Sequence, residues 1–226
     1  MHIKMSSHDG DPNIGLYVVA TDKFVIAPDE RVDGLDVLGC KNIVYTKVSE
    51  TDFLGIFICA NSKGILVPSV MSDVRLDRLK EDMAKIDKNI KIARLEGSYT
   101  ALGNLILCND KFALISPLIA EHKKLIESVL GVKVKVSILQ NMDIVGSICA
   151  VTNKGFLMNF NAEKEDYEFV KEVFGVDGDI GSVNFGSPFI KSGVIVNSKG
   201  VIAGNQTSGP EITRIDEAFG FLEKFG

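Results

Sequence analysis

Short apolar runs alternate with polar turns along this chain, and the same arrangement recurs five times. Each copy has a polar turn with lysine in third place: Thr21-Asp22-Lys23-Phe24, Asn61-Ser62-Lys63-Gly64, Asn109-Asp110-Lys111-Phe112, Thr152-Asn153-Lys154-Gly155 and Asn197-Ser198-Lys199-Gly200. Apolar stretches flank every turn, as at residues 16–20 and 56–60. Two runs of strand length joined by an Asn, Asp or Gly turn are typical of a β-hairpin. The pattern therefore predicts five hairpins in a repeat architecture with a period of about 45 residues.

A glycine precedes four of the five turns at a constant distance. Gly15, Gly55, Gly103 and Gly146 each lie eight residues before the turn lysine. Lys191 occupies that place in the fifth copy, which breaks the strict symmetry. Phe24 and Phe112 stand where the other turns have glycine, and bulky residues resist positive φ. We therefore expect those two hairpins to use a different turn geometry.

After each hairpin the apolar positions change to a helical period. The stripes are Leu76, Leu79, Met83 and Ile86; Leu118, Leu125, Ile126, Val129 and Leu130; Tyr167, Val170, Val173 and Phe174; and Ile212, Ile215, Phe219 and Leu222. Spacings of three and four residues indicate the buried face of an amphipathic helix. The first copy has a weaker stripe of Val32, Leu35 and Leu38, with Gly34 inside it.

A third strand-like run follows the helix in four copies, at residues 42–48, 90–95, 132–139 and 180–185. The fifth copy ends with its helix, and residues 3–7 precede the first hairpin without a partner of their own. We expect this N-terminal strand to complete the fifth unit and so close five α/β units into a ring without open sheet edges. The predicted units are residues 14–53, 54–101, 102–144, 145–190 and 191–226 plus strand 3–7, within a single domain spanning residues 1–226.

Composition and charge limit the classes of protein that fit. Apolar residues make up 46% of the chain, enough for a large core, and no apolar run approaches the roughly 18 residues of a membrane span. No secretory signal pattern opens the chain, so a cytoplasmic protein is expected. The net charge of −5 does not favour a broad nucleic-acid footprint, and we expect no DNA binding.

Charged residues are unevenly distributed and leave two interpretations open. Residues 161–179 hold seven acids against two lysines, which favours a solvated helix face or a surface that steers a basic partner. The five turn lysines similarly suit solvated hairpin tips or a sparse basic ring facing RNA phosphates.

Candidate catalytic and metal-binding groups are scarce. Cys40, Cys59, Cys108 and Cys149 form no C-x-x-C pair, and three of them lie in apolar runs, as small buried hydrophobes do. His2, His8 and His122 are too few and too scattered for a zinc site. Residues 9–13 resemble the start of a calcium loop but lack its later glycine and glutamate. We predict no metal, no cofactor and no catalysis.

Longer motifs give the chain a family resemblance. Residues 101–109 read Ala-Leu-Gly-Asn and continue through Leu105 to Asn109; residues 60–68 read Ala-Asn-Ser-Lys-Gly-Ile-Leu-Val-Pro; residues 151–155 read Val-Thr-Asn-Lys-Gly; and residues 183–187 read Val-Asn-Phe-Gly-Ser. In this order, essentially end to end, they resemble the translation initiation factor 6 family in its archaeal form.

That resemblance implies a fold and a function. The family has the pentein fold, a five-bladed α-β propeller of quasi-identical α/β units around a pseudo-five-fold axis. Its members bind the joining face of the large ribosomal subunit, through ribosomal proteins and rRNA, and sterically prevent association with the small subunit. They accompany large-subunit biogenesis and are released by a GTPase and its cofactor protein. A monomer without enzymatic activity is expected.

The loops that enter the first strand of each unit are expected to gather on one face of the ring. The candidate contact residues there are Asn13, Ile14, Phe53, Leu54, Leu102, Gly103, Asn104, Met142, Ile144, Asn184, Phe185, Gly186, Ser187 and Phe189. The Asn104 amide suits a hydrogen bond to a partner backbone, or alternatively a bond that stabilises its own turn. Phe185 and Phe189 suit interface anchors if exposed, or the core if buried.

Two other functions remain as alternatives. The guanidino-modifying enzymes share the pentein fold and use a cysteine nucleophile with a histidine partner. Here no cysteine follows Cys149, and no histidine lies in a predicted inner strand, which argues against that class. A ring-shaped scaffold of other specificity is the second alternative.

Overall fold

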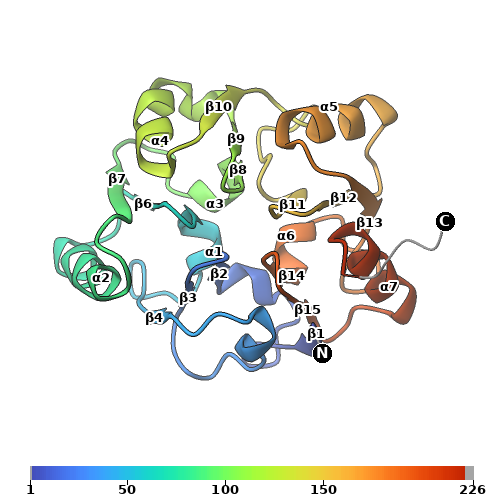
Figure 1. Ribbon diagram of the computed structural model, residues 1–226, viewed down its shortest axis with the longest axis horizontal. Helices are drawn as coiled ribbons and strands as arrows, with labels where there is room; N and C mark the ends of the chain where they lie inside the picture. Colours follow the sequence, from blue (N-terminus) through green and yellow to red (C-terminus); the bar gives the residue numbers. More distant parts are fainter. Residues whose placement is uncertain (1, 222–226) are drawn as a thin grey trace.

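The protein is described by a computed structural model covering residues 2–221, which has five small three-stranded sheets in a mixed α/β arrangement (Figure 1). The sheets contain β2 (Val19–Ala20), β3 (Val25–Ala27) and β4 (Ile43–Tyr45); β5 (Cys59–Asn61), β6 (Gly64–Pro68) and β7 (Lys91–Leu95); β8 (Ile106–Cys108), β9 (Phe112–Ile115) and β10 (Lys133–Val136); β11 (Cys149–Val151), β12 (Phe156–Asn159) and β13 (Gly178–Gly181); and β14 (Val194–Val196), β15 (Val201–Gly204) and β1 (Ile3–Ser6). We number the units in this order.

Every sheet has the same topology. Its first two strands form an antiparallel hairpin, and the third pairs in parallel with the second. In the fifth unit the parallel strand is β1, with Ile3 opposite Val201 and Ser6 opposite Gly204. The predicted hairpins and the pairing of the N-terminal strand with the fifth unit are confirmed.

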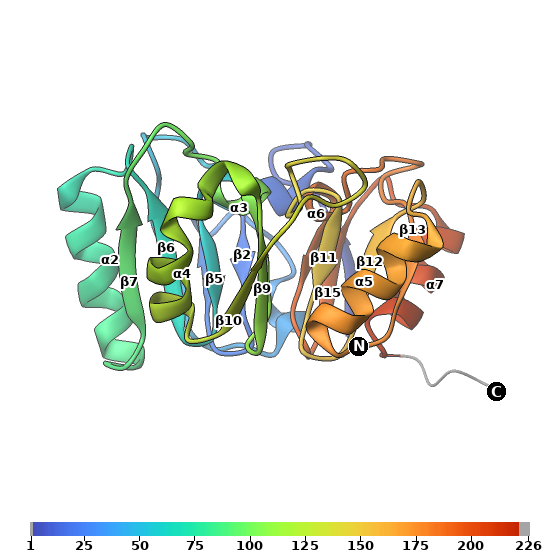
Figure 2. The same ribbon diagram turned by 90° about the horizontal axis from the view of Figure 1, so that it is seen from above.

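The first strands of the units contact one another in cyclic order. β2 contacts β5, β5 contacts β8, β8 contacts β11, β11 contacts β14, and β14 contacts β2. Figure 1 shows these strands around the middle of the molecule, with the longer helices at the rim. The molecule is thinner along the viewing direction of Figure 1 than across it, as Figure 2 shows.

The rim carries the predicted helices, namely α2 (Asp73–Ile86), α4 (Lys123–Leu130), α5 (Lys164–Phe174) and α7 (Gly209–Ala218). The first copy has only a 3₁₀ turn, η2 (Leu35–Leu38), because left-handed Gly34 and Gly39 bound it on either side. In the third copy the non-helical backbone of Ile119 interrupts η3 (Pro117–His122), which precedes α4, so Leu118 is not on the α4 stripe. Leu222 lies outside the described residues.

Each hydrophobic core is shared between two neighbouring units. Leu76 and Leu79 of α2 pack with Ile26 and Val44 of the first unit, for example. In the same way α4 contacts β6, α5 contacts β9, α7 contacts β12 and β13, and η2 contacts β15. Because burial of these apolar faces requires the adjacent sheet, each unit depends on its neighbour for a core.

In four of the five copies the first apolar run differs from the prediction of a continuous strand. One-turn helices precede the strands: η1 (Ile14–Leu16), α1 (Leu54–Phe57), α3 (Leu102–Leu105) and α6 (Ile190–Gly193). The glycines lie where these segments meet the neighbouring unit. A Cβ on Gly55 would lie 1.9 Å from the carbonyl oxygen of Gly15, and one on Gly103 would lie 2.0 Å from that of Gly55. The glycines are thus required by close backbone approach.

The expected difference in turn geometry at Phe24 and Phe112 is wrong. The Asn109 side chain accepts hydrogen bonds from the backbone N–H groups of Lys111 and Phe112, just as Asn61 does from Lys63 and Gly64. None of the five terminal turn residues has a positive φ. Gly64 is instead constrained sterically, since a Cβ would lie 2.1 Å from the Val129 carbonyl oxygen.

The Asn61 side chain joins two units through the polar turns. Its amide donates to the carbonyl oxygens of Asn109 (3.1 Å) and Leu130 (2.9 Å), while its oxygen accepts the two turn N–H groups. Asn61 is 3% exposed. Asn197 makes the equivalent bonds to Thr21 and Leu38 between the fifth and first units. These amides are therefore part of the contact between units.

Replacing Asn61 with alanine should lower the free energy of unfolding by about 3 kcal/mol, because four buried backbone groups lose their partner. Chemical denaturation of the variant measures the loss. The exposed turn residue Lys111 offers the control, since Lys111→Ala should stay within about 0.5 kcal/mol of the parent. Equal stability of Asn61→Ala and the parent would contradict this role.

Candidate functional site

The molecule has two opposite faces, which are formed by different segments of the chain. The first strand of each unit runs from its entry segment to its polar turn, so the two kinds of segment lie at opposite ends of these strands. We call the face formed by η1, α1, α3, α6 and the loops preceding the first strands the entry face, and the face formed by the five polar turns the turn face. Figure 2 shows α3 and α6 toward the upper edge, on the entry face.

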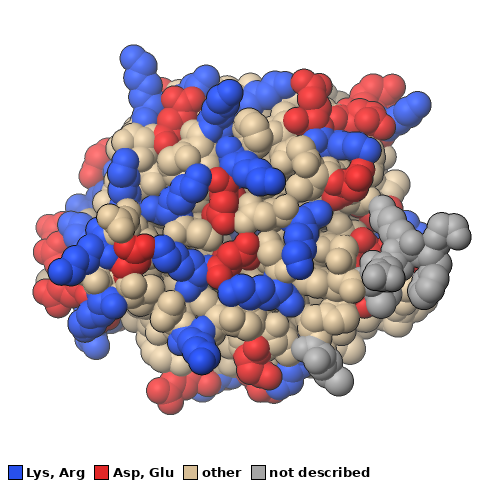
Figure 3. Space-filling view, viewed as in Figure 1, with Lys and Arg blue, Asp and Glu red and all other residues tan. Residues whose placement is uncertain are grey.

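The turn face mixes charges of both signs (Figure 3). Its lysines are largely engaged within the protein. Lys63 Nζ donates to the carbonyl oxygens of Asp110 (2.7 Å) and Gly131 (3.2 Å), and Lys199 makes the matching bonds to Asp22 and Gly39. These contacts join neighbouring units and favour a structural role for both lysines.

A hollow of about 360 Å³ lies on the entry face and brings several predicted site residues together. The hollow is lined by residues from the segments that precede four of the first strands, namely Asn13, Asn104, Ile144 and Phe189. Ser147, Lys191 and Ser192 complete the polar part of the lining. The sequence-predicted entry loops thus meet around one concave surface.

Asn104 presents its amide to this hollow without an internal partner. Within residues 2–221 no hydrogen bond to its side chain is present, although its backbone N–H donates to the Ala101 carbonyl oxygen and its carbonyl oxygen accepts from the Gly146 N–H. The Asn104 amide therefore does not stabilise its own turn, and its donors and acceptor are free for a partner.

Three phenylalanines are exposed on this face. Phe185 is 84% exposed, Phe189 47% and Phe53 37%. The Phe53 ring stacks on Tyr17 with ring centroids 5.3 Å apart, which fixes its orientation. Exposed rings of this size are the usual anchors of a protein interface.

A rigid loop carries Phe185. Asn184 and Phe185 have φ values of 47° and 62°, a left-handed conformation that non-glycine residues rarely adopt. The Glu211 carboxylate accepts hydrogen bonds from the N–H groups of Phe185 (3.2 Å) and Gly186 (2.9 Å). The Asn184 amide donates to the Pro12 carbonyl oxygen at 3.0 Å. Asn184 is thus a structural link to the first unit that holds the loop in place.

Burial by itself would raise the pKa of Glu211, but hydrogen bonds from Ser182, Ser208 and Gly186 together outweigh it and hold the pKa at about 2, against 4.5 ordinarily. The folded-state pKa is lowered, so this carboxylate stabilises the protein above about pH 4.5 and the contribution is lost as pH falls toward 2.

We therefore expect Glu211→Gln to cost about 2 kcal/mol at pH 6, with the difference from the parent shrinking as the pH is lowered to 3. Denaturant unfolding across this pH range measures it. Glu217→Gln, an exposed change on the same helix, is the control. A stability difference independent of pH would refute the assigned ionisation.

The other predicted site residues range from fully buried to exposed. Ile14, Leu54 and Leu102 are at most 1% exposed, and Gly103 is buried against the backbone of the second unit. Met142 and Ile144 are half-buried and pack on the core shared by the third and fourth units. Gly186 is exposed, and Ser187 is half-buried and pairs with Val183. The buried residues shape the face rather than present side chains on it.

Sequence reasoning missed two residues of this region. Glu211 lies on α7, far along the chain from the loop that it holds, and only its place three residues after Ser208 marked it as a helix-capping residue. Lys191 lines both the hollow and a deeper central cavity. Its replacement of a repeated glycine was the one signal of a special role.

Within residues 2–221 no group of three or more His, Cys, Asp or Glu side chains could hold a metal ion. No helix in that part of the chain is long and apolar enough to cross a membrane.

Known proteins match the chain over nearly its whole length. The sequence profile of the eIF-6 family matches residues 3–218. Translation initiation factor 6 of Thermococcus onnurineus is 35% identical over 228 residues, covering 99% of this chain and 100% of that protein. The factor of the same name from Saccharolobus solfataricus is 38% identical, covering 97% and 100% respectively, and that of Methanocaldococcus jannaschii is 35% identical, covering 94% and 96%. The chain belongs to the eIF-6 family, whose matched relatives are named translation initiation factor 6.

Proposed function

We propose that this protein binds the large ribosomal subunit through its entry face and thereby prevents the small subunit from joining. The observation that carries the proposal is the combination of the unpartnered Asn104 amide with the exposed Phe185 and Phe189 rings on that face. Membership of a family of translation factors supports a ribosomal partner. The protein acts by occupying space, and it performs no catalysis.

The fold supports such a mechanism. We propose that residues 1–226 form a single pentein domain, a five-bladed α-β propeller with the unit boundaries expected from the repeats. Cores shared between neighbours and the cyclic contacts of the inner strands support this assignment. A rigid disc can exclude a second large body without a conformational change of its own.

The remaining parts of the proposal follow the family. The protein acts as a cytoplasmic monomer during large-subunit biogenesis and is released by a GTPase and its cofactor protein. The guanidino-modifying alternative receives no support from the thiols, since no hydrogen bond joins a histidine ring to a cysteine in the described part of the chain.

Binding variants test which face docks. Asn104→Ala and Phe185→Ala should each weaken co-sedimentation with large subunits at least tenfold, about 1.4 kcal/mol, while unfolding stays within about 0.5 kcal/mol of the parent. Lys111→Glu, a charge reversal on the turn face, is the matched control and should bind normally. Loss of binding by Lys111→Glu alone would overturn the assignment of the entry face and favour a basic ring facing rRNA.

A further inference from the structure

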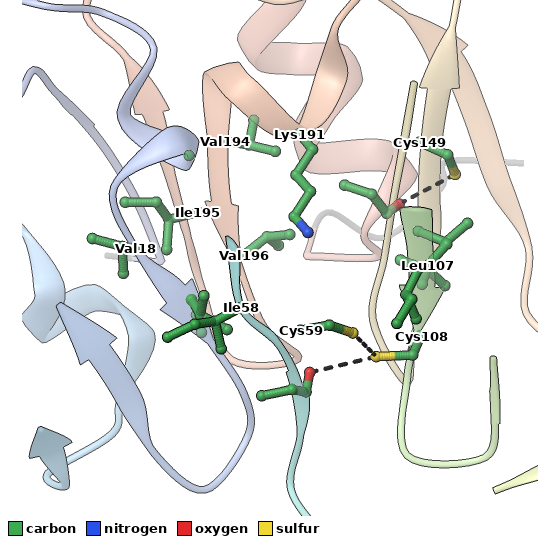
Figure 4. A pocket seen from close by; sticks show the side chains of 17 residues that line it. Val18, Ile58, Cys59, Leu107, Cys108, Cys149, Lys191, Val194, Ile195 and Val196 are labelled. Atoms are coloured by element: carbon green, nitrogen blue, oxygen red, sulfur yellow. Dashed lines mark hydrogen bonds between the residues drawn. The ribbon is translucent and has the colours of Figure 1, made fainter. Parts of the chain in front are cut away.

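A second, deeper cavity lies along the middle of the molecule beneath the entry-face hollow. Its volume is about 80 Å³, and inner strands of all five units line it. Most of the lining is aliphatic, but Cys59, Cys108 and Cys149 contribute thiols, and Lys191 contributes an ammonium group (Figure 4). None of the three thiols has a part in the proposed ribosome contact, whereas Lys191 also lines the entry-face hollow.

Two of the thiols face each other across the junction of the second and third units. The sulfurs of Cys59 on β5 and Cys108 on β8 are 3.4 Å apart. A disulfide needs about 2.05 Å, so the sulfurs must approach by about 1.4 Å to form one. Cys59 is 3% exposed, and Cys108 is half-buried with its sulfur 3.5 Å from the Ala60 carbonyl oxygen. The pair is thus close, unbonded and inside the cavity.

Lys191 brings its side-chain amine into the same space, where burial lowers the pKa of Lys191 and the neighbouring Cys59 and Cys108 thiols oppose that effect. Its Nζ donates to the Gly103 carbonyl oxygen at 2.8 Å, and in Figure 4 its side chain points toward the two sulfurs. An ammonium group near a thiol favours the thiolate, which is the nucleophilic form. The hydrogen bond with Cys108 lowers the pKa of Cys59, and the Lys191 charge lowers it further against the effect of burial.

Cys149 differs from the pair although it lines the same cavity. Burial raises its pKa, and within residues 2–221 the one hydrogen-bond partner of its sulfur is the Ala150 carbonyl oxygen, at 3.7 Å. Cys40 lies outside the cavity lining, half-buried beside the Asn42 carbonyl oxygen. Cys149 therefore serves as the internal reference for the reactivity of the pair, and Cys40 can be replaced without changing the cavity.

We propose that Cys59 and Cys108 form an oxidisable dithiol site, which hydrogen peroxide converts reversibly into a disulfide between the second and third units. The cavity volume selects this class of oxidant. A space of about 80 Å³ admits molecules the size of water or peroxide, whereas a tripeptide disulfide is far too large.

The chemistry proceeds in two balanced steps. The Cys59 thiolate attacks one peroxide oxygen, the O–O bond breaks, and the hydroxide that leaves takes up a proton as water, so that Cys59 becomes a sulfenic acid. The Cys108 sulfur then attacks the Cys59 sulfur, the S–O bond breaks, and the hydroxyl leaves with the Cys108 proton as a second water. Two thiols and one peroxide thus give one disulfide and two waters.

The test counts thiols by mass in the full-length Cys40→Ser variant, which retains three cysteines. After peroxide treatment, the protein is unfolded and alkylated with N-ethylmaleimide. The expected product carries one adduct instead of three and has lost two hydrogen atoms, with peptide mapping joining Cys59 to Cys108; dithiothreitol restores three adducts. Three adducts after treatment, or oxygen addition without the cross-link, would overturn the proposal.

Two further variants separate the steps. Cys108→Ser should stop at the Cys59 sulfenic acid, which dimedone traps when the peroxide-treated protein is unfolded in its presence, and should give no cross-link. Lys191→Met should slow disulfide formation about tenfold by reducing the thiolate fraction. If Lys191→Met fails to fold, the Cys108→Ser result still decides the matter, because dimedone labelling of Cys149 or of neither cysteine would refute the site.

Discussion

Replacing Gly55 with alanine is expected to destabilise the protein by about 3–5 kcal/mol, because the new Cβ would overlap the backbone of the first unit. It would lie 1.9 Å from the Gly15 carbonyl oxygen and 3.1 Å from the Leu16 carbonyl carbon. Backbone atoms cannot rotate aside as a side chain can, so η1 and α1 would have to separate.

This separation should spread beyond one contact. A Cβ on Gly103 would lie 2.0 Å from the Gly55 carbonyl oxygen, and a Cβ on Gly146 would lie 2.3 Å from the Gly103 carbonyl oxygen. Displacing one entry segment therefore disturbs the next. Thermal unfolding should show a midpoint lowered on the order of 10 °C for a chain of this size.

Gly209→Ala is the matched control. Gly209 opens α7, has ordinary φ and has no atom near its absent Cβ, so alanine should be neutral or slightly stabilising there. Equal effects of the two substitutions would mean that the entry segments are not closely packed.

Deleting residues 1–7 should also destabilise the protein severely, by about 4 kcal/mol or more, because β15 loses its parallel partner. The Val201 N–H donates to the His2 carbonyl oxygen and the Asn205 N–H donates to that of Ser6, both at 2.8 Å. The His2 ring also contacts the Asp216 carboxylate of α7 at 2.7 Å, and Asp216 is 8% exposed.

The control keeps the backbone and changes a side chain. Met5 is 44% exposed on β1, so Met5→Thr should alter the unfolding free energy by less than about 0.5 kcal/mol. Denaturant unfolding compares the two proteins. If the deletion unfolds like the parent, the N-terminal strand does not hold the first and fifth units together.

Much of this fold was predictable because its signals are local. The polar turns determine the hairpins, since Asn or Thr in first place accepts hydrogen bonds from the turn backbone. The helical stripes identify α2, α4, α5 and α7, and the repeat itself identifies the missing strand as β1. None of these inferences needed the arrangement of the units in space.

The entry segments were not predictable for the opposite reason. A four-residue apolar run such as Leu54–Phe57 suits a strand or a helical turn equally, and only contact with the neighbouring unit decides between them. The same holds for Lys191, whose side chain lies in a cavity made by five units. The expectation for Phe24 was wrong for a similar reason. The turn glycines are required by nearby backbone atoms and not by a positive φ, which only the folded structure shows.

For the candidate site, the sequence indicated loops that lie together on one face, but not which of their side chains are accessible. Leu54 and Leu102 are fully buried while Phe185 is 84% exposed, although all three are apolar residues in entry loops. Exposure at Phe185 depends on the left-handed loop backbone and on Glu211, which is 26 residues away. Such long-range support leaves no periodic signal.

The most direct test of the proposed occlusion mixes purified archaeal large and small ribosomal subunits with this protein and measures joined ribosomes by sedimentation. If occlusion is the mechanism, the protein migrates with large subunits, and joined ribosomes decrease as its concentration rises. The Phe185→Ala variant then needs at least a tenfold higher concentration for the same decrease. Undiminished joining with the protein bound, or no binding to large subunits even at low salt, would contradict the account and favour a scaffold of other specificity.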